Sequence, residues 1–429
     1  MAAPPSDSLR SAALRELTAR GYFEQASDLE VLDQSLADGM VTVYVGYDPT
    51  ADSLHVGSLL TIMALRVLQR HGHRPLCLLG GGTALVGDPS GRTETRRMLD
   101  AATIAANGAA FQRQIANFIH FDRGEPNDAL MLDNSAWLLE LGYLQFLRDI
   151  GRHFTVNRMI AAKTYRERLE GELPLSFLEF NYQLLQAYDF MHLHREFGCT
   201  LQLGGADQWG NMVAGVELIR RMAAHGGDSD CDRDAVQCLT LPLLTTRDGR
   251  KMGKTERGAV WLDPEKVSAF DYYQYWINCD DDMVAQLLRL FTEIPLPEIA
   301  ELTANDGAAL REAKRRLAYD ATALLHGAEA AEKAEKASQQ AFGGGDDWSA
   351  VASVDVPGPS IKLIDLVVHD KLAAFRSKRD ARQRIESGAV RLDGEPCTDP
   401  NRVIEAEECG PAGIRLQAGK RRRFRVVLS

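Results

Sequence analysis

The feature that most constrains the fold is a strand–helix–strand pattern near the N-terminus. Residues 41–45 are rich in β-branched and aromatic side chains, residues 59–68 carry Leu and Ile at helical spacing, and residues 74–79 form a second apolar run. Ser53 is the expected N-cap of the helix and Gly72 its end. A βαβ unit of this length requires parallel strands, so the sequence predicts an α/β fold with a Rossmann-like parallel sheet.

The rest of the chain divides by pattern into further units. Helical spacing runs from Leu9 to about Leu36, and short strands are expected at 201–203 and 239–244. We expect a sheet domain over 1–250 with a helical insertion at about 111–197, a loop and helical domain over 251–340, a linker over 341–360 that is rich in Gly and Pro, and a small α+β domain over 361–429.

Charge separates the last unit from the others. The whole chain carries a net charge of −11, yet residues 361–429 hold 15 Lys and Arg against 10 Asp and Glu. Within this unit, 371–385 is a basic amphipathic stretch and 388–395 reads as a hairpin. The basic run 420–423 fits a localisation signal or a solvated tail as well as a contact with RNA. The excess of positive charge in residues 361–429 favours a localised contact with a polyanion.

Several classes of protein are not expected. No apolar run approaches the roughly 20 residues of a membrane span, and Met1–Ser8 lacks the basic start and apolar core of a signal peptide. Seven scattered cysteines indicate reduced thiols in the cytoplasm. Cys231 and Cys238 are too far apart in sequence for a zinc hook, and His192 and His194 lack an evident third ligand, so no metal site is expected.

Two short motifs indicate a site for phosphate. His55-Val56-Gly57-Ser58 lies at the start of the first predicted helix, where free N–H groups and the helix dipole favour an anion. Residues 251–255, Lys-Met-Gly-Lys-Thr, form a cationic loop after a strand. Taken singly, a His near a helix start is usually a cap and such a loop a solvated turn. The pair, about 200 residues apart in sequence and each at a strand end, is specific.

Other nucleotide loops do not fit. Residues 82–87 have the spacing of a P-loop, but Asp88 stands where Lys is required.

Tyr182, Gln186 and Asp189 share one face of a predicted helix and would present a phenol, an amide and a carboxylate to a small ligand. The alternative for that helix alone is an ordinary polar, solvent-facing side.

With these blocks in view, the chain resembles the bacterial-type tyrosyl-tRNA synthetases, a family of class I aminoacyl-tRNA synthetases. The two motifs look like the HIGH and KMSKS signatures, and four further blocks match in order: 44–55, 87–91, 185–190 and 204–211. The final unit resembles the small RNA-binding fold found at the end of these enzymes, although many RNA-modifying enzymes carry a similar module.

The resemblance implies a role for each matched residue. Tyrosine would be bound by Tyr44, Asp88, Tyr182, Gln186, Asp189 and Gln208; ATP by Gly46, Asp48, His55, Gly57, Ser58, Thr61, Gly205, Asp207, Lys251 and Lys254. Thr50, His55, Lys251, Lys254 and Thr255 would stabilise the departing pyrophosphate, with Arg92 and Arg96 on a loop above it.

The resemblance further implies the substrates and the assembly. The substrates would be L-tyrosine, ATP with Mg²⁺, and tRNA(Tyr); no cofactor would be tightly bound, and the enzyme would be a homodimer. Ser58 and Gly253 depart from the signatures: Ser58 offers a shorter side chain to the ribose than the second His of HIGH, and Gly253 removes one loop hydroxyl. A tryptophanyl relative, a small-metabolite nucleotidyltransferase and a non-catalytic RNA-binding protein remain as alternatives.

Overall fold

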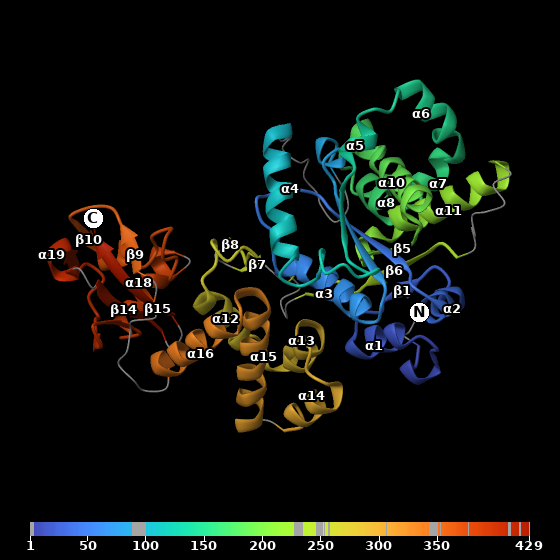
Figure 1. Cartoon of the computed structure of the whole chain (residues 1–429). Coiled ribbons are helices and arrows are strands. Elements are labelled where there is room, and N and C mark those ends of the chain that lie inside the picture. Colours follow the sequence, from blue (N-terminus) through green and yellow to red (C-terminus); the bar gives the residue numbers. More distant parts are fainter. Residues whose placement is uncertain are drawn as a thin grey trace.

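The computed structural model describes residues 4–87, 100–226, 235–245, 252, 254–255, 258–305, 307–342, 351, 353–375, 377–410, 413–419 and 422–428. A six-stranded sheet of order β1-β6-β5-β2-β3-β4 forms its centre (Figure 1). All neighbours are parallel except β1, which pairs antiparallel with β6. The strands are β1 (Gln25–Ala26), β2 (Thr42–Tyr47), β3 (Arg74–Leu79), β4 (Leu130–Asp133), β5 (Cys199–Gly205) and β6 (Gln237–Leu241). The predicted parallel sheet is confirmed.

The strand order contains a reversal at β2. From β2 the chain moves outward to β3 and β4, and it then returns to β5 and β6 on the other side of β2. Connections on the two sides of such a point leave in opposite directions, so a crevice opens at the carboxyl ends of β2 and β5. Ligands of open α/β sheets bind at this place.

Helices cover both faces of the sheet. Val43 and Val45 pack in one core with α3, whereas Tyr44, between them, packs with Phe190 of α10 in another. This alternation follows from the two-residue period of a strand. The covering helices are α1 (Ala12–Arg20), α2 (Leu29–Asp38), α3 (Val56–Arg70), α4 (Ala101–Ile115), α10 (Tyr182–Phe197) and α11 (Trp209–Gly226).

Several boundaries differ from the sequence prediction. The helical stretch expected from Leu9 to Leu36 is two helices, because Gly21 adopts φ 95° and ends α1. The expected insertion at 111–197 contains β4, which extends the sheet beside β3. Its four residues are too few for periodicity to separate a strand from a helix. The short helices that follow are α5 (Ser135–Leu138), α6 (Tyr143–Asp149), α7 (Val156–Ile160), α8 (Lys163–Glu170) and α9 (Phe177–Phe180).

The region after the sheet is helical, as expected. Trp276 and Phe291 lie in the same core as the α3 face of the sheet, so this region is packed onto the first domain. It begins with the paired strands β7 (Lys254–Thr255) and β8 (Gly258–Ala259). Its helices are α12 (Ala269–Ile277), α13 (Val284–Phe291), α14 (Leu296–Leu302), α15 (Ala308–His326) and α16 (Ala328–Phe342).

The C-terminal unit has a core of its own and lies beyond α16 (Figure 1). Its main sheet has the order β12-β11-β14-β15-β9, and β10 pairs with β13. Residues 353–356 form β9 and pair with β15, so the unit begins inside the predicted linker of 341–360; the buried Val356 anchors that strand. The predicted hairpin is confirmed as β11 and β12. The elements are β9 (Ser353–Val356), β10 (Ser360–Lys362), α17 (Leu363–Leu366), α18 (Lys378–Glu386), β11 (Val390–Leu392), β12 (Glu395–Pro396), β13 (Val403–Glu405), α19 (Ala406–Cys409), β14 (Ile414–Ala418) and β15 (Arg422–Leu428). Across the described ranges, no helix combines the length and apolar character needed to cross a bilayer.

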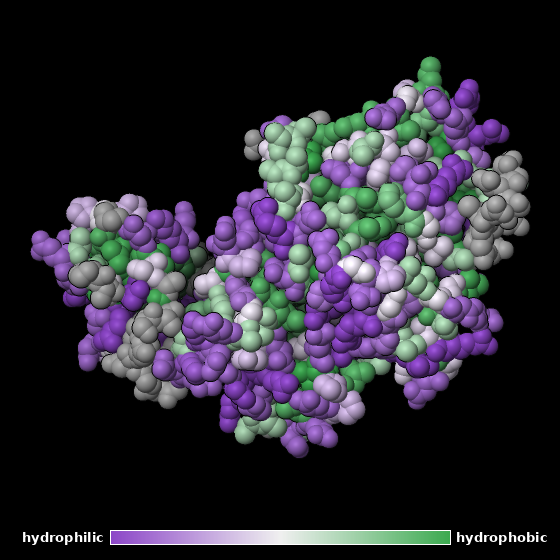
Figure 2. Space-filling model, viewed as in Figure 1, coloured by the Kyte–Doolittle hydropathy of each residue, from purple (hydrophilic) through white to green (hydrophobic). Residues whose placement is uncertain are grey.

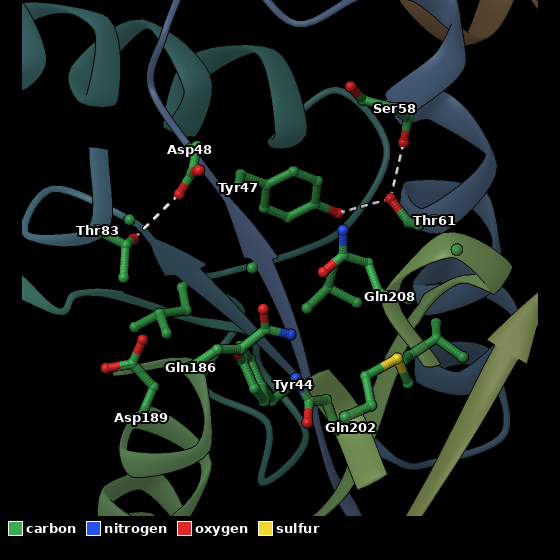
Figure 3. Close-up of a pocket in the computed structure, with 18 of the residues that line it drawn as sticks. Tyr44, Tyr47, Asp48, Ser58, Thr61, Thr83, Gln186, Asp189, Gln202 and Gln208 are labelled. Carbon is green, nitrogen blue, oxygen red and sulfur yellow. Dashed lines mark hydrogen bonds between the residues drawn. The ribbon is translucent and has the colours of Figure 1, made fainter. Parts of the chain in front are cut away.

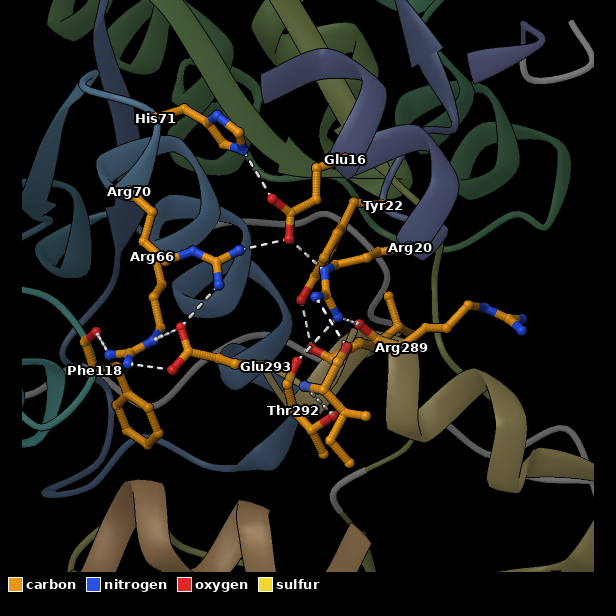
Figure 4. Close-up of polar contacts among 12 residues, drawn as sticks. Glu16, Arg20, Tyr22, Arg66, Arg70, His71, Phe118, Arg289, Thr292 and Glu293 are labelled. Atoms are coloured by element: carbon orange, nitrogen blue, oxygen red, sulfur yellow. Dashed lines mark hydrogen bonds and ion pairs between the residues drawn. The ribbon is translucent and has the colours of Figure 1, made fainter. Parts of the chain in front are cut away.

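A polar network connects α1, α3 and the turn after α13 (Figure 4). Glu16 of α1 accepts hydrogen bonds from Arg20 and from Arg70 of α3. Glu293 accepts from Arg66 at 2.7 Å and from Arg70 at 3.1 Å. Arg70 therefore bridges two carboxylates that lie 277 residues apart in sequence, and it links the helical region to the helix that begins with the first phosphate motif.

Arg20 completes this junction. Its side chain is buried and donates to the carbonyl oxygens of Arg289, Thr292 and Ile294 at 3.1–3.2 Å. These carbonyls lie in the last turn of α13 and in the residues just after it, where the helix itself supplies no donors. The arginine thus satisfies buried acceptors of one domain from a helix of the other.

We expect Glu16→Gln to weaken this junction in a pH-dependent way. Burial raises the pKa of Glu16, but hydrogen bonds from Arg20 and His71 and the charge of Arg70 outweigh it, lowering that pKa from 4.5 to about 2. A lowered folded-state pKa gives stability that is present above pH 4.5 and is lost as pH falls toward 2. The thermal midpoint of the variant should lie a few degrees below that of the unmodified protein at pH 7.

The pH profile of the midpoint, followed by circular dichroism, distinguishes this from a loss of packing. The difference should persist from pH 7 to 5 and should shrink below pH 4.5. Glu329→Gln is the matched control, because it removes an exposed pair with Lys333 on α16 that contributes little. A difference that does not change with pH would contradict the assignment.

Candidate active site

A cavity of about 310 Å³ opens at the carboxyl ends of β2 and β5, where the strand order reverses. Its lining joins strands, the start of α3 and one face of α10 (Figure 3). The site residues expected from the sequence that line it are Tyr44, Gly46, Asp48, Thr50, His55, Ser58, Thr61, Tyr182, Gln186, Asp189, Gly205 and Gln208.

The segment just after the second phosphate motif pairs through its backbone with the first motif. The N–H of Val56 donates to the carbonyl of Val260 at 2.9 Å, and that of Leu262 donates to Leu54 at 2.8 Å. His55 and Trp261 form the β-bridge between these bonds. The segment that follows β8 is therefore fixed against the start of α3, which brings the surroundings of the second motif to the first.

His55 is the N-cap residue of α3, in place of the predicted Ser53. Its backbone is extended and its side chain does not cap the helix, while Ser53 instead donates to the Leu54 carbonyl at 2.8 Å. The His55 ring folds back over Gly57, where an added Cβ would lie 2.7 Å from ring Cε1 and 3.2 Å from the Met252 carbonyl oxygen. Gly57 does not line the cavity, and a side chain there would displace the His55 ring and crowd the Met252 carbonyl.

The start of α3 can receive an anion. His55 and Ser58 line the cavity at the first turn of this 15-residue helix, where the helix dipole is positive. Thr61, one turn further, donates to the Ser58 carbonyl at 2.9 Å, and its hydroxyl lies 3.2 Å from the Tyr47 hydroxyl (Figure 3). This end of the cavity suits phosphate and ribose oxygens.

Asp48 lies between this end and α10. Its carboxylate accepts hydrogen bonds from Thr83 at 3.0 Å and from the Tyr182 hydroxyl at 3.2 Å. A Cβ added at Gly80 would lie 2.2 Å from Asp48 Oδ1, so the glycine run after β3 makes room for the carboxylate. The side chain can accept from a ribose hydroxyl or an ammonium group.

Asp189 and Tyr44 form the far end of the cavity. Asp189 is buried and accepts from Asn134 Nδ2 at 2.9 Å and from Trp137 Nε1 at 2.8 Å. Burial raises the pKa of Asp189 to about 7, although these two hydrogen bonds oppose the rise. Burial and the nearby Asp189 raise the pKa of Tyr44 well above its usual value, so its hydroxyl remains a donor. A donor beside an acceptor matches a ligand hydroxyl, which can both accept and donate.

The side chains between the two ends are polar amides. Asn211 donates to Gln186 Oε1 at 3.1 Å and to Gln208 Oε1 at 3.2 Å, and so holds both amides in one orientation. Gly205 is the last residue of β5. A Cβ added there would lie 2.8 Å from Asp207 Oδ1. Asp207 is thus adjacent to the cavity, although it is not one of its lining residues.

Some expected residues cannot be placed. Asp88, Arg92, Arg96 and Lys251 lie outside the described residues. Lys254 and Thr255 form β7 with their backbones, and their side chains are outside the description as well.

The structure also shows cavity residues that sequence reasoning missed. Thr83, Asn134 and Gln202 line the cavity, and Trp137 holds Asp189 from behind. Asn134 follows β4, the strand that was read as helix, so its place at a strand end was hidden. Gln202 did carry a signal, because it is a polar residue between two leucines of a buried strand.

The two alternating histidines do not converge on a metal. The His192 ring stacks on Trp137, whereas His194 Nδ1 lies 3.0 Å from the carbonyl of Cys199, the first residue of β5. Within the described ranges no three His, Cys, Asp or Glu side chains gather as ligands. Cys231 lies outside those ranges, and Cys238 is a buried thiol.

Comparisons with known proteins agree with this geometry. Residues 37–343 match the family model of class I tRNA synthetases (W and Y), and residues 346–421 match the SYY-like C-terminal domain of tyrosine–tRNA ligases. The tyrosine–tRNA ligase of Zymomonas mobilis is 49% identical over 96% of this chain and 97% of its own length. That of a Caulobacter species is 46% identical over 97% of each chain.

A solved structure shows the same architecture. A C-terminally truncated mitochondrial tyrosyl-tRNA synthetase from Aspergillus nidulans superposes with a TM-score of 0.69 at 31% identity, covering 78% of this chain and 95% of that one. The match with family models over both the sheet domain and the C-terminal unit, together with these full-length relatives, leads to one conclusion. The chain belongs to the tyrosine–tRNA ligases, a family of class I tRNA synthetases.

Proposed function

We propose that this protein activates L-tyrosine with ATP and transfers the tyrosyl group to the 3′ end of tRNA(Tyr). The observation that carries the proposal is a single cavity with two chemically distinct ends. One end is the positive N-terminus of α3, and the other is the buried pair of Tyr44 and Asp189. An anionic nucleotide and a phenolic amino acid would lie end to end between them.

The far end would recognise the tyrosine side chain. Tyr44 would donate to the substrate hydroxyl, and Asp189 would accept from it. Phenylalanine has no hydroxyl and would leave both groups buried without a partner, which is costly. Tyr182, Gln186, Gln208 and the undescribed Asp88 would hold the ammonium and carboxylate groups, a role supported by the way Asn211 orients the two amides.

The near end would hold ATP. His55 and Thr50 would contact the phosphates from the α3 side, and Lys251, Lys254 and Thr255 would approach from the second motif. Gly46, Asp48, Ser58, Thr61, Gly205 and Asp207 would surround the ribose and base. Magnesium would enter with ATP, bound by its phosphates, as part of that substrate.

The reaction then needs positioning and charge stabilisation, with no enzyme nucleophile. A carboxylate oxygen of tyrosine forms a bond to the α-phosphorus of ATP while the bond to the pyrophosphate oxygen breaks. The terminal ribose hydroxyl of tRNA next attacks the tyrosyl carbonyl carbon, and AMP leaves. The developing charge on pyrophosphate would be met by the N-terminus of α3 and by the lysines of the second motif.

The C-terminal unit would bind the tRNA away from the acceptor end. Arg379, Arg382 and Arg384 are exposed on α18, and Arg422 and Arg425 lie on β15. The exposed arginines of α18 support RNA as the partner of this basic unit. The proposal also places the enzyme in the cytoplasm, where tRNA is charged.

We expect His55→Ala to lower the rate of adenylate formation by about two to three powers of ten, as the loss of one transition-state donor does. The KM for tyrosine should be nearly unchanged, because His55 lies at the phosphate end. Tyrosine-dependent exchange of labelled pyrophosphate into ATP measures both. His71→Ala, at the other end of α3, is the control and should retain the rate. An unaltered rate in His55→Ala would remove this residue from the mechanism.

We further propose that the enzyme is a homodimer formed through the helical insertion. Large apolar side chains are exposed there, and hydrophobic surface is visible around α6 at the top of Figure 2. The most exposed, with exposed fractions of 57–79%, are Leu139, Tyr143, Leu144, Val156 and Phe177. So many exposed apolar side chains in one region favour a second copy of the same surface as the partner.

Leu144→Asp combined with Phe177→Asp should convert the protein to a monomer, because each change places a charge in the proposed contact. Sedimentation velocity would report twice the mass of one chain for the unmodified protein and a single chain for the variant. Val403→Asp is the matched control, since that residue is 41% exposed in the C-terminal unit. A monomeric unmodified protein, or a variant that remains dimeric, would contradict the placement.

A further inference from the structure

The carboxylate of Asp189 is oriented by two side chains from one short segment. Asn134 Nδ2 donates to Oδ2 at 2.9 Å, and Trp137 Nε1 donates to Oδ1 at 2.8 Å. Each oxygen thus has one donor, which fixes the plane of the carboxylate and the direction of its remaining lone pairs. Recognition of a ligand hydroxyl by Asp189 depends on where these two donors are held.

The two donors are not held equally well. Asn134 is buried, and its side chain also accepts from the Gly82 N–H at 2.8 Å. Trp137 lies on α5, a helix of four residues without a side-chain cap. Leu139, the residue that follows this helix, is 65% exposed. One helical turn is marginal on its own. The indole must therefore be held by packing against another element.

Part of that packing comes from His192 of α10; Trp137 also packs against the core cluster around Phe190. The imidazole stacks on the indole with ring centroids 4.3 Å apart and planes at 26°. Tyr188 stacks behind His192 at 6.4 Å, and Phe146 of α6 packs against Tyr188 at 5.8 Å. Burial lowers the pKa of His192, so the ring is neutral near pH 7 and stacks as an aromatic. His192 lies three residues after Asp189, one turn along the same helix.

We infer that His192 is a positioning residue for amino-acid recognition, which acts by holding the Trp137 indole so that its N–H points at Asp189. The inference rests on the proposed tyrosine specificity and adds a residue that does not touch the substrate. The helix α10 thus carries both Asp189 and His192, and the His192 ring holds the Trp137 indole that donates to Asp189. Loss of the ring should loosen one of the two donors and leave Asn134 in place.

His192→Ala should raise the KM for tyrosine about three- to tenfold, the range that an aromatic stack contributes. The kcat and the KM for ATP should remain within about twofold, because the phosphate end is untouched. Discrimination against phenylalanine, expressed as the ratio of kcat/KM values, should fall by a similar factor. His192→Phe retains a flat ring in the same place and should restore the KM for tyrosine. Pyrophosphate exchange provides all of these values.

His194→Ala is the matched control. It removes a histidine from the same helix, and its ring contacts the Cys199 carbonyl and not Trp137. Its tyrosine KM should equal that of the unmodified enzyme even if its thermal midpoint falls. An unchanged KM in His192→Ala, or an equal defect in His192→Phe, would overturn the inference.

A second measurement does not depend on activity. With 5-fluorotryptophan incorporated at the five Trp positions, the ¹⁹F resonance of Trp137 is identified by its absence in Trp137→Phe. That resonance should shift and broaden in His192→Ala and remain in place in His194→Ala. If the unmodified enzyme showed no tyrosine-dependent exchange, the proposed function would fail while this spectrum still reported on the contact between His192 and Trp137. A Trp137 resonance that His192→Ala leaves unchanged would overturn the inference that His192 holds the Trp137 indole.

Discussion

The architecture of the site depends on a short stretch of backbone pairing between residues 54–56 and 260–262. Two hydrogen bonds and the His55–Trp261 bridge join segments that are about 200 residues apart in sequence. This pairing fixes the segment after the second motif against the start of α3, and the Met252 carbonyl packs near Gly57. Without it, neither motif is more than an ordinary surface feature. The packing of α13 against α3, and the Arg20 and Arg70 contacts, hold the same two parts of the chain together from the other side.

The second constraint is the reversal of strand order at β2. It opens the crevice in which the cavity lies, and the alternation of side chains along β2 then assigns them to faces. Val43 and Val45 are used for packing under α3, so Tyr44 must face α10. Because α10 presents Tyr182, Gln186 and Asp189 at helical spacing, the phenol of Tyr44 meets a polar helix face. The chemistry of the cavity thus follows from two periodicities, one of a strand and one of a helix.

Much of this could be predicted from the sequence because it depends on local patterns. The βαβ unit, the polar face of α10 and the hairpin predicted at residues 388–395, which is β11 and β12, were all correctly predicted. Features that depend on tertiary contacts were not. The strand β4 has only four residues, and without it Asn134 and Trp137 had no visible relation to Asp189. His55 replaced Ser53 as the N-cap because its backbone is fixed by pairing with a distant segment. The stack of His192 on Trp137 joins residues 55 positions apart and leaves no trace in spacing.

The central claim is that a phosphate end and a phenol end act together in one reaction. The most direct test is exchange of labelled pyrophosphate into ATP by the purified full chain, run with tyrosine, with tryptophan, with phenylalanine and with no amino acid. The donor and acceptor at Tyr44 and Asp189 predict exchange with tyrosine and almost none in the other three reactions. Exchange without any amino acid, or with tryptophan alone, would contradict the account.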